Sequence, residues 1–230
     1  MPKTTHRTLV KAGRAGLAEL ADPEKAVDMR KYMKSEMPYR GVSKPQRAAL
    51  IKRLMAEHQL SDVDALVAAA LELWRAAKYR EERYLAIDLT GQRPYAAWQD
   101  VSLMPLYEEM IVTGAWWDYV DEVAVRRIGP LLRDNPVALT PTMRAWSTDP
   151  DPWRRRTSII CQVGSKAKTD TALLADCIVA SVDDPGFFLR KGIGWALRQH
   201  SKVDAAWVRA FVDAHPELSP LSRREATKYL

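Results

Sequence analysis

Helix-start signals recur along this chain at short intervals, and they restrict its fold more than any other feature. Each signal is a Ser, Thr or Asp that can cap a helix, usually followed by a proline that fits the first helical turn. The signals are Asp22-Pro23, Ser43-Lys44-Pro45, Ser61-Asp62, Thr140-Pro141, Asp151-Pro152, Thr169-Asp170, Asp184-Pro185, Asp204 and Ser219-Pro220. Hairpin dipeptides flanked by alternating β-branched runs are nearly absent. The pattern therefore predicts an all-α protein.

The spacing of the signals predicts short helices joined by short links. The expected helices cover residues 6–21, 23–33, 44–58, 63–77, 80–89 and 95–112, the last bent at Pro105, followed by a helix from Trp117 that ends near Gly129-Pro130. With the later signals this gives about twelve or thirteen helices, which pair into about six units of ~35–40 residues, the length of HEAT-type and armadillo-type repeats. Such units stack into a curved solenoid. We therefore expect a C-shaped, HEAT-like helical-repeat solenoid with a concave basic groove, and a single domain over residues 1–230, because no linker rich in Gly, Ser or Pro interrupts the chain.

The charge and composition of the chain indicate which kinds of partner and cellular location to expect. The 230 residues carry a formal net charge of +6, and such a balance favours a polyanion, with nucleic acid first and acidic lipid second. No apolar run approaches the ~20 residues of a membrane span, and no apolar segment follows the basic N-terminus as in a secretory signal. Cys161 and Cys177 have no Cys or His beside them at metal-ligand spacing. We expect a monomer in a reducing cytoplasm, associated with the nucleoid, with no metal and no cofactor.

The stretch 113–128 holds the most unusual local pattern. Its apolar positions recur at helical spacing and can face a core; they are Trp116, Val120, Val123 and Ile128. Trp117 and Asp121 are four residues apart, so they lie one above the other on a neighbouring face of the same helix. A ring face beside a carboxylate can cradle a cationic or sugar-like ligand. The more common interpretation of such a pattern is a core tryptophan and an Asp that opposes the helix dipole.

Two later stretches carry basic residues on expected helices. Arg154–Arg156 follow the cap at Asp151, and guanidinium groups at a helix N-terminus suit phosphate oxygens, although a solvated basic turn fits the pattern as well. In the stretch 187–198, the residues on one helical face are Lys191, Trp195 and Arg198. Gly192 and Gly194 each cost ~1 kcal/mol inside a helix, which indicates close approach of a neighbouring helix or a ligand.

Familiar catalytic signatures are missing from the sequence. It has no Gly-rich phosphate loop and no GxSxG, HExxH or CxxC motif. Schiff-base chemistry needs a desolvated lysine, so phosphate contact is favoured for Lys191. The histidines lie near expected helix ends and are interpreted as surface residues; they are His6, His58, His200 and His215.

Together, six motifs resemble the DNA alkylation repair family, and more narrowly its AlkD-like alkylpurine DNA glycosylases built from HEAT-like repeats. The motifs are Tyr32-Met33-Lys34, Pro38-Tyr39-Arg40-Gly41-Val42, Ala86-Ile87-Asp88-Leu89, Trp116-Trp117-Asp118-Tyr119-Val120-Asp121, Arg155-Arg156-Thr157 and Ile193-Gly194-Trp195-Ala196-Leu197-Arg198. Leu221-Ser222-Arg223-Arg224-Glu225-Ala226 near the end also fits. The resemblance covers nearly the whole chain from about Tyr32, and the order of the motifs matches as well as their composition.

The resemblance implies roles for individual residues. Asp121 matches the catalytic carboxylate, and Trp117 and Trp195 match two aromatics that line the site and pack against the deoxyribose of the lesion. Arg156 matches an arginine that contacts the DNA backbone, and Tyr32 a tyrosine that lines the cleft. The further residues that we expect to contact DNA are Trp116, Arg155, Lys191, Arg198, Lys44 and Arg47.

One position departs from the family. Ser43 stands where a longer polar side chain is expected in close relatives. This departure affects the expected substrate range and leaves the expected chemistry unchanged.

The implied activity is excision of cationic N3- or N7-alkylated purines, such as 3-methyladenine and 7-methylguanine, from duplex DNA in base excision repair. The alkylated base leaves as a neutral molecule, so no general acid is needed, and a carboxylate can stabilise the sugar cation that develops. One alternative is a non-catalytic solenoid that binds DNA shape. A second is a protein-interaction scaffold, which would have an acidic or apolar concave face.

Overall fold

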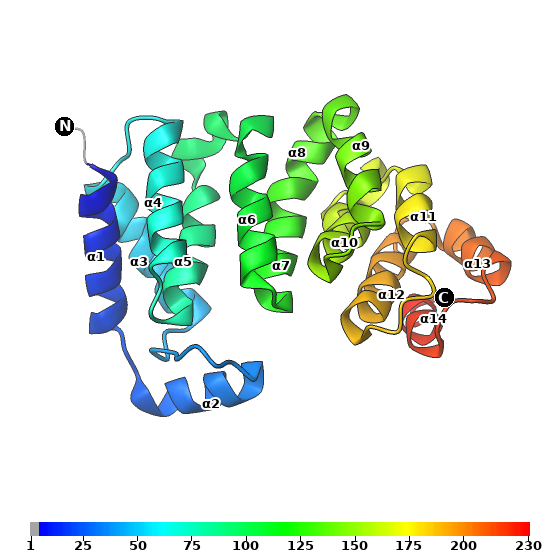
Figure 1. Ribbon diagram of the computed structural model, residues 1–230, viewed down its shortest axis with the longest axis horizontal. Coiled ribbons are helices and arrows are strands. Elements are labelled where there is room, and N and C mark those ends of the chain that lie inside the picture. The colour runs from blue at the N-terminus through cyan, green and yellow to red at the C-terminus, as the bar shows by residue number, and fades with distance from the viewer. Residues whose placement is uncertain (1–4) are drawn as a thin grey trace. The chain divides into compact units, whose positions relative to one another are not determined.

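A computed structural model describes residues 5–230 of the chain. Within them it contains fourteen α-helices, several short 3₁₀ segments, one π-helical segment and no strand. The all-α prediction is confirmed, and within each of the two units described next, successive helices pack side by side as in helical-repeat proteins (Figure 1). The packing divides the chain into two compact units, of which the first ends at Gln99 and the second spans Asp100–Leu230. The HEAT-type assignment, the C-shape and the single domain stay predictions.

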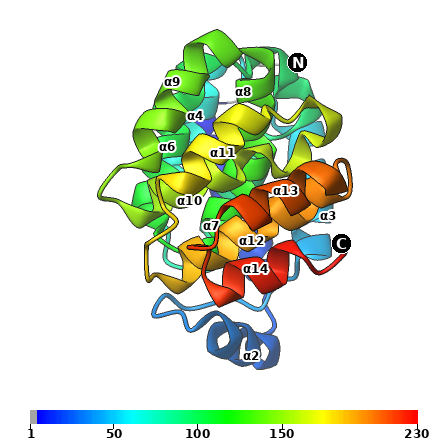
Figure 2. The ribbon, with the colours of Figure 1, turned by 90° about the vertical axis from the view of Figure 1, so that its right-hand side faces the viewer.

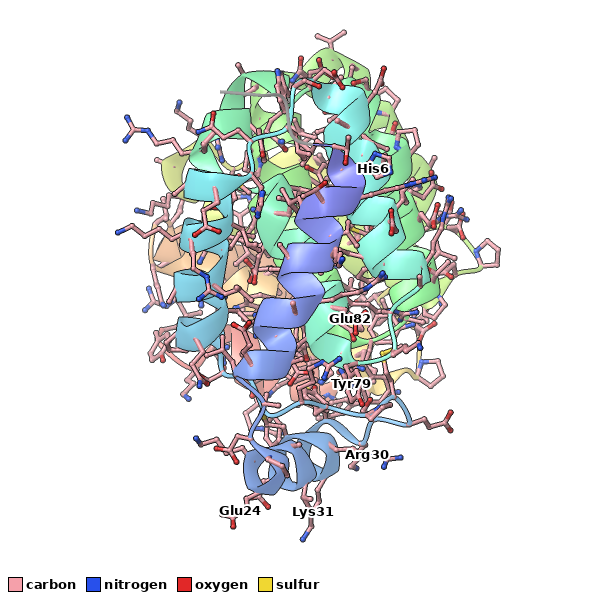
Figure 3. The ribbon with its side chains drawn as sticks, turned by 90° about the vertical axis from the view of Figure 1, so that its left-hand side faces the viewer. His6, Glu24, Arg30, Lys31, Tyr79 and Glu82 are labelled. Carbon is pink, nitrogen blue, oxygen red and sulfur yellow. The ribbon has the colours of Figure 1, made fainter. Side chains whose placement is uncertain are left out.

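The first unit contains five α-helices among its described residues, followed by one 3₁₀ segment. They are α1 (His6–Glu19), α2 (Pro23–Met33), α3 (Lys44–Glu57), α4 (Val63–Arg75), α5 (Arg80–Thr90) and η1 (Arg93–Trp98). Helices α1, α3, α4 and α5 stand side by side around a core that includes Leu17, Leu66, Trp74 and Leu85. Helix α2 lies across their ends, as Figures 1 and 3 show, and it buries only Met33.

A buried carboxylate fixes the loop between α2 and α3. Glu81 of α5 accepts hydrogen bonds from the backbone N–H groups of Arg40, Gly41 and Val42 at 2.9–3.1 Å. Gly41 has a φ of +84°, and a Cβ there would collide with the carbonyl oxygen of Asp22. The loop therefore needs glycine at this position, since a side chain would meet both strain and a clash.

The second unit contains nine α-helices. They are α6 (Met104–Gly114), α7 (Trp117–Val123), α8 (Gly129–Asp134), α9 (Pro136–Ser147), α10 (Pro152–Ile160), α11 (Thr171–Val179), α12 (Phe187–Ser201), α13 (Ala205–Ala214) and α14 (Pro220–Ala226). Four short segments link them: η2 (Val101–Leu103), the π-helical η3 (Ala124–Ile128), η4 (Cys161–Gly164) and η5 (Lys166–Lys168). Helix α10 packs against α7, α9 and α12, and α14 runs along α12 (Figures 1 and 2).

Most of the predicted helix starts are confirmed. The side chains that accept a hydrogen bond from the first helical turn include Asp22, Asp62, Asp151, Asp170, Asp204 and Ser219. Ser43 begins α3 through a different contact: its backbone N–H and its hydroxyl both donate to Oε1 of Gln46, at 2.9 and 2.7 Å. These are local signals, which explains why the sequence reveals them.

Two expectations about α6 and α7 are wrong. The helix expected over 95–112 is replaced by η1, η2 and α6, because Asp100 caps Ser102 N and Pro105 occupies the first turn of α6. The helix from Trp117 does not end near Gly129 but continues through η3 into α8. A Cβ at Gly129 would collide with the carbonyl oxygen of Cys161, so this glycine serves close packing instead of a helix end.

Two later helix starts are also misplaced. Thr140-Pro141 lies inside α9, which begins at Pro136. The proline leaves the carbonyl of Val137 without its usual partner, but Val137 is 91% exposed, so water can hydrate that group. Asp184 does not cap α12 directly; its carboxylate accepts from Gly186 N, and the helix starts at Phe187.

Within residues 5–230, every helix is too short or too polar to cross a membrane.

Candidate active site

Helix α7 holds the carboxylate that the sequence singles out. Tyr119, Val120 and Val123 face the core with no exposed surface, which leaves Asp121 on the opposite side of this short helix. Its side chain retains 18% exposure. The core positions expected from the periodicity are thus confirmed for Val120, Val123 and Ile128, whereas Trp116 is half-buried.

Arg156 of α10 binds both oxygens of this carboxylate through one edge of its guanidinium, formed by Nε and Nη2. Nε donates to Oδ1 of Asp121 at 2.7 Å and Nη2 donates to Oδ2 at 2.8 Å. Nη1 donates to the backbone carbonyl oxygen of Phe188 at the start of α12. The Arg156 side chain is only 5% exposed. One guanidinium therefore ties together three helices, α7, α10 and α12.

The glycine at 192 makes room for this arginine. A Cβ on Gly192 would lie 3.0 Å from Nη1 of Arg156 and 3.5 Å from Ile160. Close approach was expected at this glycine, with a helix or a ligand as the neighbour, and here the neighbour is the side chain of Arg156 from α10. The fit between α10 and α12 thus sets the position of the guanidinium.

Burial and the contact with Arg156 act in opposite directions on the charge state of Asp121. Desolvation raises the pKa of its carboxyl above the usual 3.8, and the hydrogen bonds and charge of Arg156 oppose this rise while the charge of Asp118 adds to it. The bidentate contact with a permanent cation favours the ionised form at neutral pH. The carboxylate is thus ionised, held in one orientation and partly accessible.

Trp117 lies on the helix that carries Asp121 and Trp195 on the helix that packs against Arg156, and both are half-buried. Trp117 lies one turn before Asp121 on α7, and Trp195 lies one turn after Gly192, the residue that contacts Arg156. By helical spacing both belong to faces next to the pair. Their convergence on Asp121 stays a prediction.

An aromatic cluster that the sequence analysis missed adjoins the pair. The ring centroids of Trp116, Trp153 and Phe188 lie 5.1–6.4 Å from one another, and Phe187 stacks edge-on against Phe188. Phe187 is 59% exposed, which makes an apolar surface at the start of α12, where the carbonyl oxygen of Phe188 accepts from Arg156. The Phe187-Phe188 pair at a helix start was the available signal.

The consecutive arginines are paired with acids instead of standing free. Arg154 contacts Glu108 at 2.7 Å and Asp149 at 3.1 Å, and Arg155 contacts Asp184 at 2.8 Å. Together with the Asp121 contact of Arg156, each arginine of the run has a carboxylate partner. A DNA phosphate would have to compete with these acids, and the contact of Arg155 and Arg156 with DNA stays a prediction.

Lys191 and Arg198 share one carboxylate from α14. Lys191 Nζ lies 2.7 Å from Oε1 of Glu225, and Arg198 Nη1 donates to Oε2. A Cβ on Gly194 would lie 2.5 Å from Cβ of Glu225 and 2.9 Å from the carbonyl oxygen of Ser222. The absence of a side chain at Gly194 therefore lets α14 pack closely against α12. Glu225 was named only within a closing motif, and no sequence signal placed it between two cations.

The three residues of the first unit that we expect to contact DNA differ in their exposure. Tyr32 on α2 is 76% exposed, and Lys44 in the first turn of α3 is exposed. Arg47 is buried and its Nε donates to Oδ2 of Asp88 at 3.1 Å, with its guanidinium 4.6 Å from the ring of Tyr84. Arg47 thus forms an internal ion pair and offers little charge to a partner.

His200 does not lie on the surface as expected. It is 7% exposed, packs edge-on against Trp207, and neither ring nitrogen has a hydrogen-bond partner. Among residues 5–230, no three His, Cys, Asp or Glu side chains gather in a way that could hold a metal ion. Cys161 and Cys177 are buried free thiols whose pKa values are raised by burial, that of Cys177 to about 11.

Comparison with known proteins places these observations in context. The profile of the family described as "DNA alkylation repair enzyme" matches residues 14–230. A solved structure described as "Predicted DNA alkylation repair enzyme from Enterococcus faecalis" is similar, with a TM-score of 0.79 and 31% identity over 91% of this chain and 96% of that chain. No curated protein sequence matches the chain significantly.

Proposed function

The chain belongs to the DNA alkylation repair enzyme family, and from that premise we propose that it is a monofunctional DNA glycosylase for cationic alkylpurines. Its substrates are N3- and N7-alkylated purines in duplex DNA, such as 3-methyladenine and 7-methylguanine. The observation that carries the proposal is the ionised, 18% exposed carboxylate of Asp121, held by two hydrogen bonds from one edge of the Arg156 guanidinium.

The reaction follows from the charge of the lesion. The N-glycosidic bond breaks with its electron pair moving to the base, which cancels the positive charge of the alkylated ring. The base leaves neutral, and no acid has to protonate it. The deoxyribose is left as an oxocarbenium ion, water adds to its anomeric carbon, and one proton is released. The products are a free base and an abasic site.

Asp121 acts on the two steps that involve the sugar. Its charge stabilises the developing cation, and its free lone pairs orient the water that attacks. At ~4 Å and an effective dielectric of about 20, one such charge interaction contributes ~4 kcal/mol, which corresponds to roughly a thousandfold in rate. Arg156 reduces the net negative charge of the site, but it holds the carboxylate in one orientation. Arg156 is therefore a positioning residue in this proposal.

The aromatic residues complete the site in this proposal. Trp117 and Trp195 offer ring faces to the sugar cation and exclude water from it. Tyr32, Trp116 and Lys44 contact the duplex. Because Arg47 and Arg156 are buried in internal ion pairs, we propose that they shape the contact surface instead of binding phosphate directly.

The bidentate pair also favours a second candidate. Because Arg156 engages both oxygens of Asp121, the carboxylate also has a purely structural use, as in a non-catalytic protein that binds DNA shape. A protein of that kind would bind duplexes and release no base.

One incubation separates the two candidates. A duplex with a single 7-methylguanine is mixed with excess protein, and free base is measured beside the abasic site that alkali cleaves. Release of 7-methylguanine, with an undamaged duplex as control, is the expected result. Tight binding of the duplex without any free base would support the non-catalytic candidate.

A further inference from the structure

A single carboxylate of α14 lies between two cations of α12. Glu225 contacts Lys191 Nζ at 2.7 Å through Oε1 and Arg198 through Oε2. The Glu225 side chain is 15% exposed, whereas Lys191 keeps 41% exposure. Lys191 and Arg198 flank Trp195 on one helical face. The carboxylate thus occupies the space between the two charges beside a proposed site residue.

The packing of α14 delivers Glu225 to this position. Gly194 lacks the side chain that would meet Glu225 Cβ and Ser222 O, so α14 approaches α12 closely. The hydroxyl of Ser222 donates to the carbonyl oxygen of Arg190 at 2.9 Å and fixes the register of the two helices. Figure 2 shows α14 lying alongside α12. The carboxylate is therefore held by the fold and not by a chance rotamer.

Positive charge remains in excess around this carboxylate. The hydrogen bond from Lys191 lowers the pKa of Glu225 below its usual range; burial opposes this, and the charges of Lys191, Arg198 and Lys228 lower the pKa further. Three cations therefore act on one anion. An ammonium and a guanidinium that bind two oxygens of one anionic group are also the arrangement that binds phosphate.

We propose that Lys191 and Arg198 form a phosphate-binding site that Glu225 occupies in the free protein. A backbone phosphate of duplex DNA takes the place of the carboxylate on binding. This inference rests on the proposed function in one respect, namely that the phosphate belongs to DNA. Glu225 thereby weakens binding to ordinary duplex and keeps both cations oriented beside Trp195.

The test compares two variants that remove one negative charge each. Glu225→Gln keeps the shape of the side chain, and Asp176→Asn removes the charge of an exposed ion pair with Arg144 on another helix. Affinity for an undamaged duplex is measured at several salt concentrations by fluorescence anisotropy. For Glu225→Gln we expect about fivefold tighter binding at low salt and a salt slope steeper by about one unit, the value for one additional neutralised phosphate. Asp176→Asn should match the wild type in slope.

A second readout does not depend on DNA. Inorganic phosphate, compared with chloride at equal ionic strength, should raise the melting temperature of Glu225→Gln more than that of Asp176→Asn. Adding Lys191→Gln to Glu225→Gln should remove both the gain in duplex affinity and the larger rise in melting temperature with phosphate. If Glu225→Gln loosens α14, Lys191→Gln alone provides a second test, because it removes one of the two cations and should make the salt slope shallower by about one unit.

The outcomes distinguish the inference from the proposed function. The inference is overturned if the Glu225→Gln and Asp176→Asn proteins share one salt slope on a duplex that both bind. If neither protein binds duplex DNA, the proposed function is overturned and the phosphate response decides the inference alone. A phosphate response in that case assigns the site to free phosphate, and its absence overturns the site.

Discussion

At the scale of single residues, the contact between Asp121 and Arg156 has a structural role beside the catalytic role proposed for Asp121. Each partner lies largely out of water, so the pair is costly to break: an uncompensated buried charge destabilises a protein by ~3–5 kcal/mol. Substitution of either partner is therefore expected to affect stability. Asp121 has two hydrogen bonds from Arg156 and only 18% exposure. Stability and catalysis have to be measured separately at this site.

Substitution of Arg156 separates positioning from charge. Arg156→Ala should lower the free energy of unfolding by about 2–3 kcal/mol, less than for a fully buried pair because Asp121 is partly hydrated. Arg156→Lys retains the charge but lacks the planar pair of donors that binds both oxygens of Asp121. We expect it to keep duplex affinity within about twofold and to lose more than tenfold in single-turnover excision, since the carboxylate is no longer fixed in orientation. Urea unfolding, anisotropy and base release measure the three quantities. Equal excision by Arg156→Lys and wild type would contradict a positioning role.

At the scale of helices, close contacts at glycine connect the elements of the second unit. Gly192 admits Arg156 between α10 and α12, and Gly194 admits α14 against α12. The sequence predicts that something approaches these glycines, since they are costly inside a helix. It does not predict what approaches, because the partners come from residues about thirty positions away.

Gly194→Ala tests the contact between α12 and α14. The added Cβ would lie 2.5 Å from Glu225 Cβ and 2.9 Å from a backbone oxygen, so α14 has to shift. We expect a loss of about 1–3 kcal/mol of stability, the usual cost of overpacking. Gly164→Ala is the matched control, because its Cβ would meet Val125 only at 3.7 Å. Thermal unfolding checks both variants. Equal melting temperatures for the two would show that the close approach does not constrain α14.

At the scale of the whole molecule, the sequence predicts the local features and misses those that depend on distant residues. Caps such as Asp22, Asp62 and Asp204 act on their own first turn, so they can be read from the chain. The pairing of Asp121 with Arg156 spans 35 positions, and no periodicity encodes it. From the sequence alone, Arg154–Arg156 are expected to form a basic surface. The acids that pair with them lie outside their helix, so the sequence pattern does not reveal the pairing.

Global stability should respond to pH through His200. Burial lowers the pKa of this histidine below 6.5, and the charge of Asp204 opposes the shift only in part. The unfolded chain therefore binds a proton more readily than the folded one, so stability is full above about pH 6.5 and falls as the pH decreases toward the folded pKa. His200→Phe retains an aromatic ring against Trp207 and should weaken this dependence. Urea unfolding between pH 5 and 8 compares the two proteins. Parallel curves for wild type and variant would contradict the assignment.

The most direct test of the proposed reaction is single-turnover excision of 7-methylguanine by Asp121→Asn. The substitution changes the charge of the site by one unit whether or not Arg156 stays in place. Excision per folded molecule should therefore fall by about two to three powers of ten, from ~3–4 kcal/mol of lost transition-state stabilisation. Duplex affinity should hold or rise slightly, because a negative charge has left a site that binds a polyanion.

The control is Asp118→Asn, which removes an equal charge from the first turn of the same helix and should retain most of the activity. Both variants are assayed below their melting temperatures, and the folded fraction is measured in each sample. A large loss of rate is expected for Asp121→Asn alone. Release of 7-methylguanine by folded Asp121→Asn protein at the wild-type rate would contradict a catalytic role of this carboxylate.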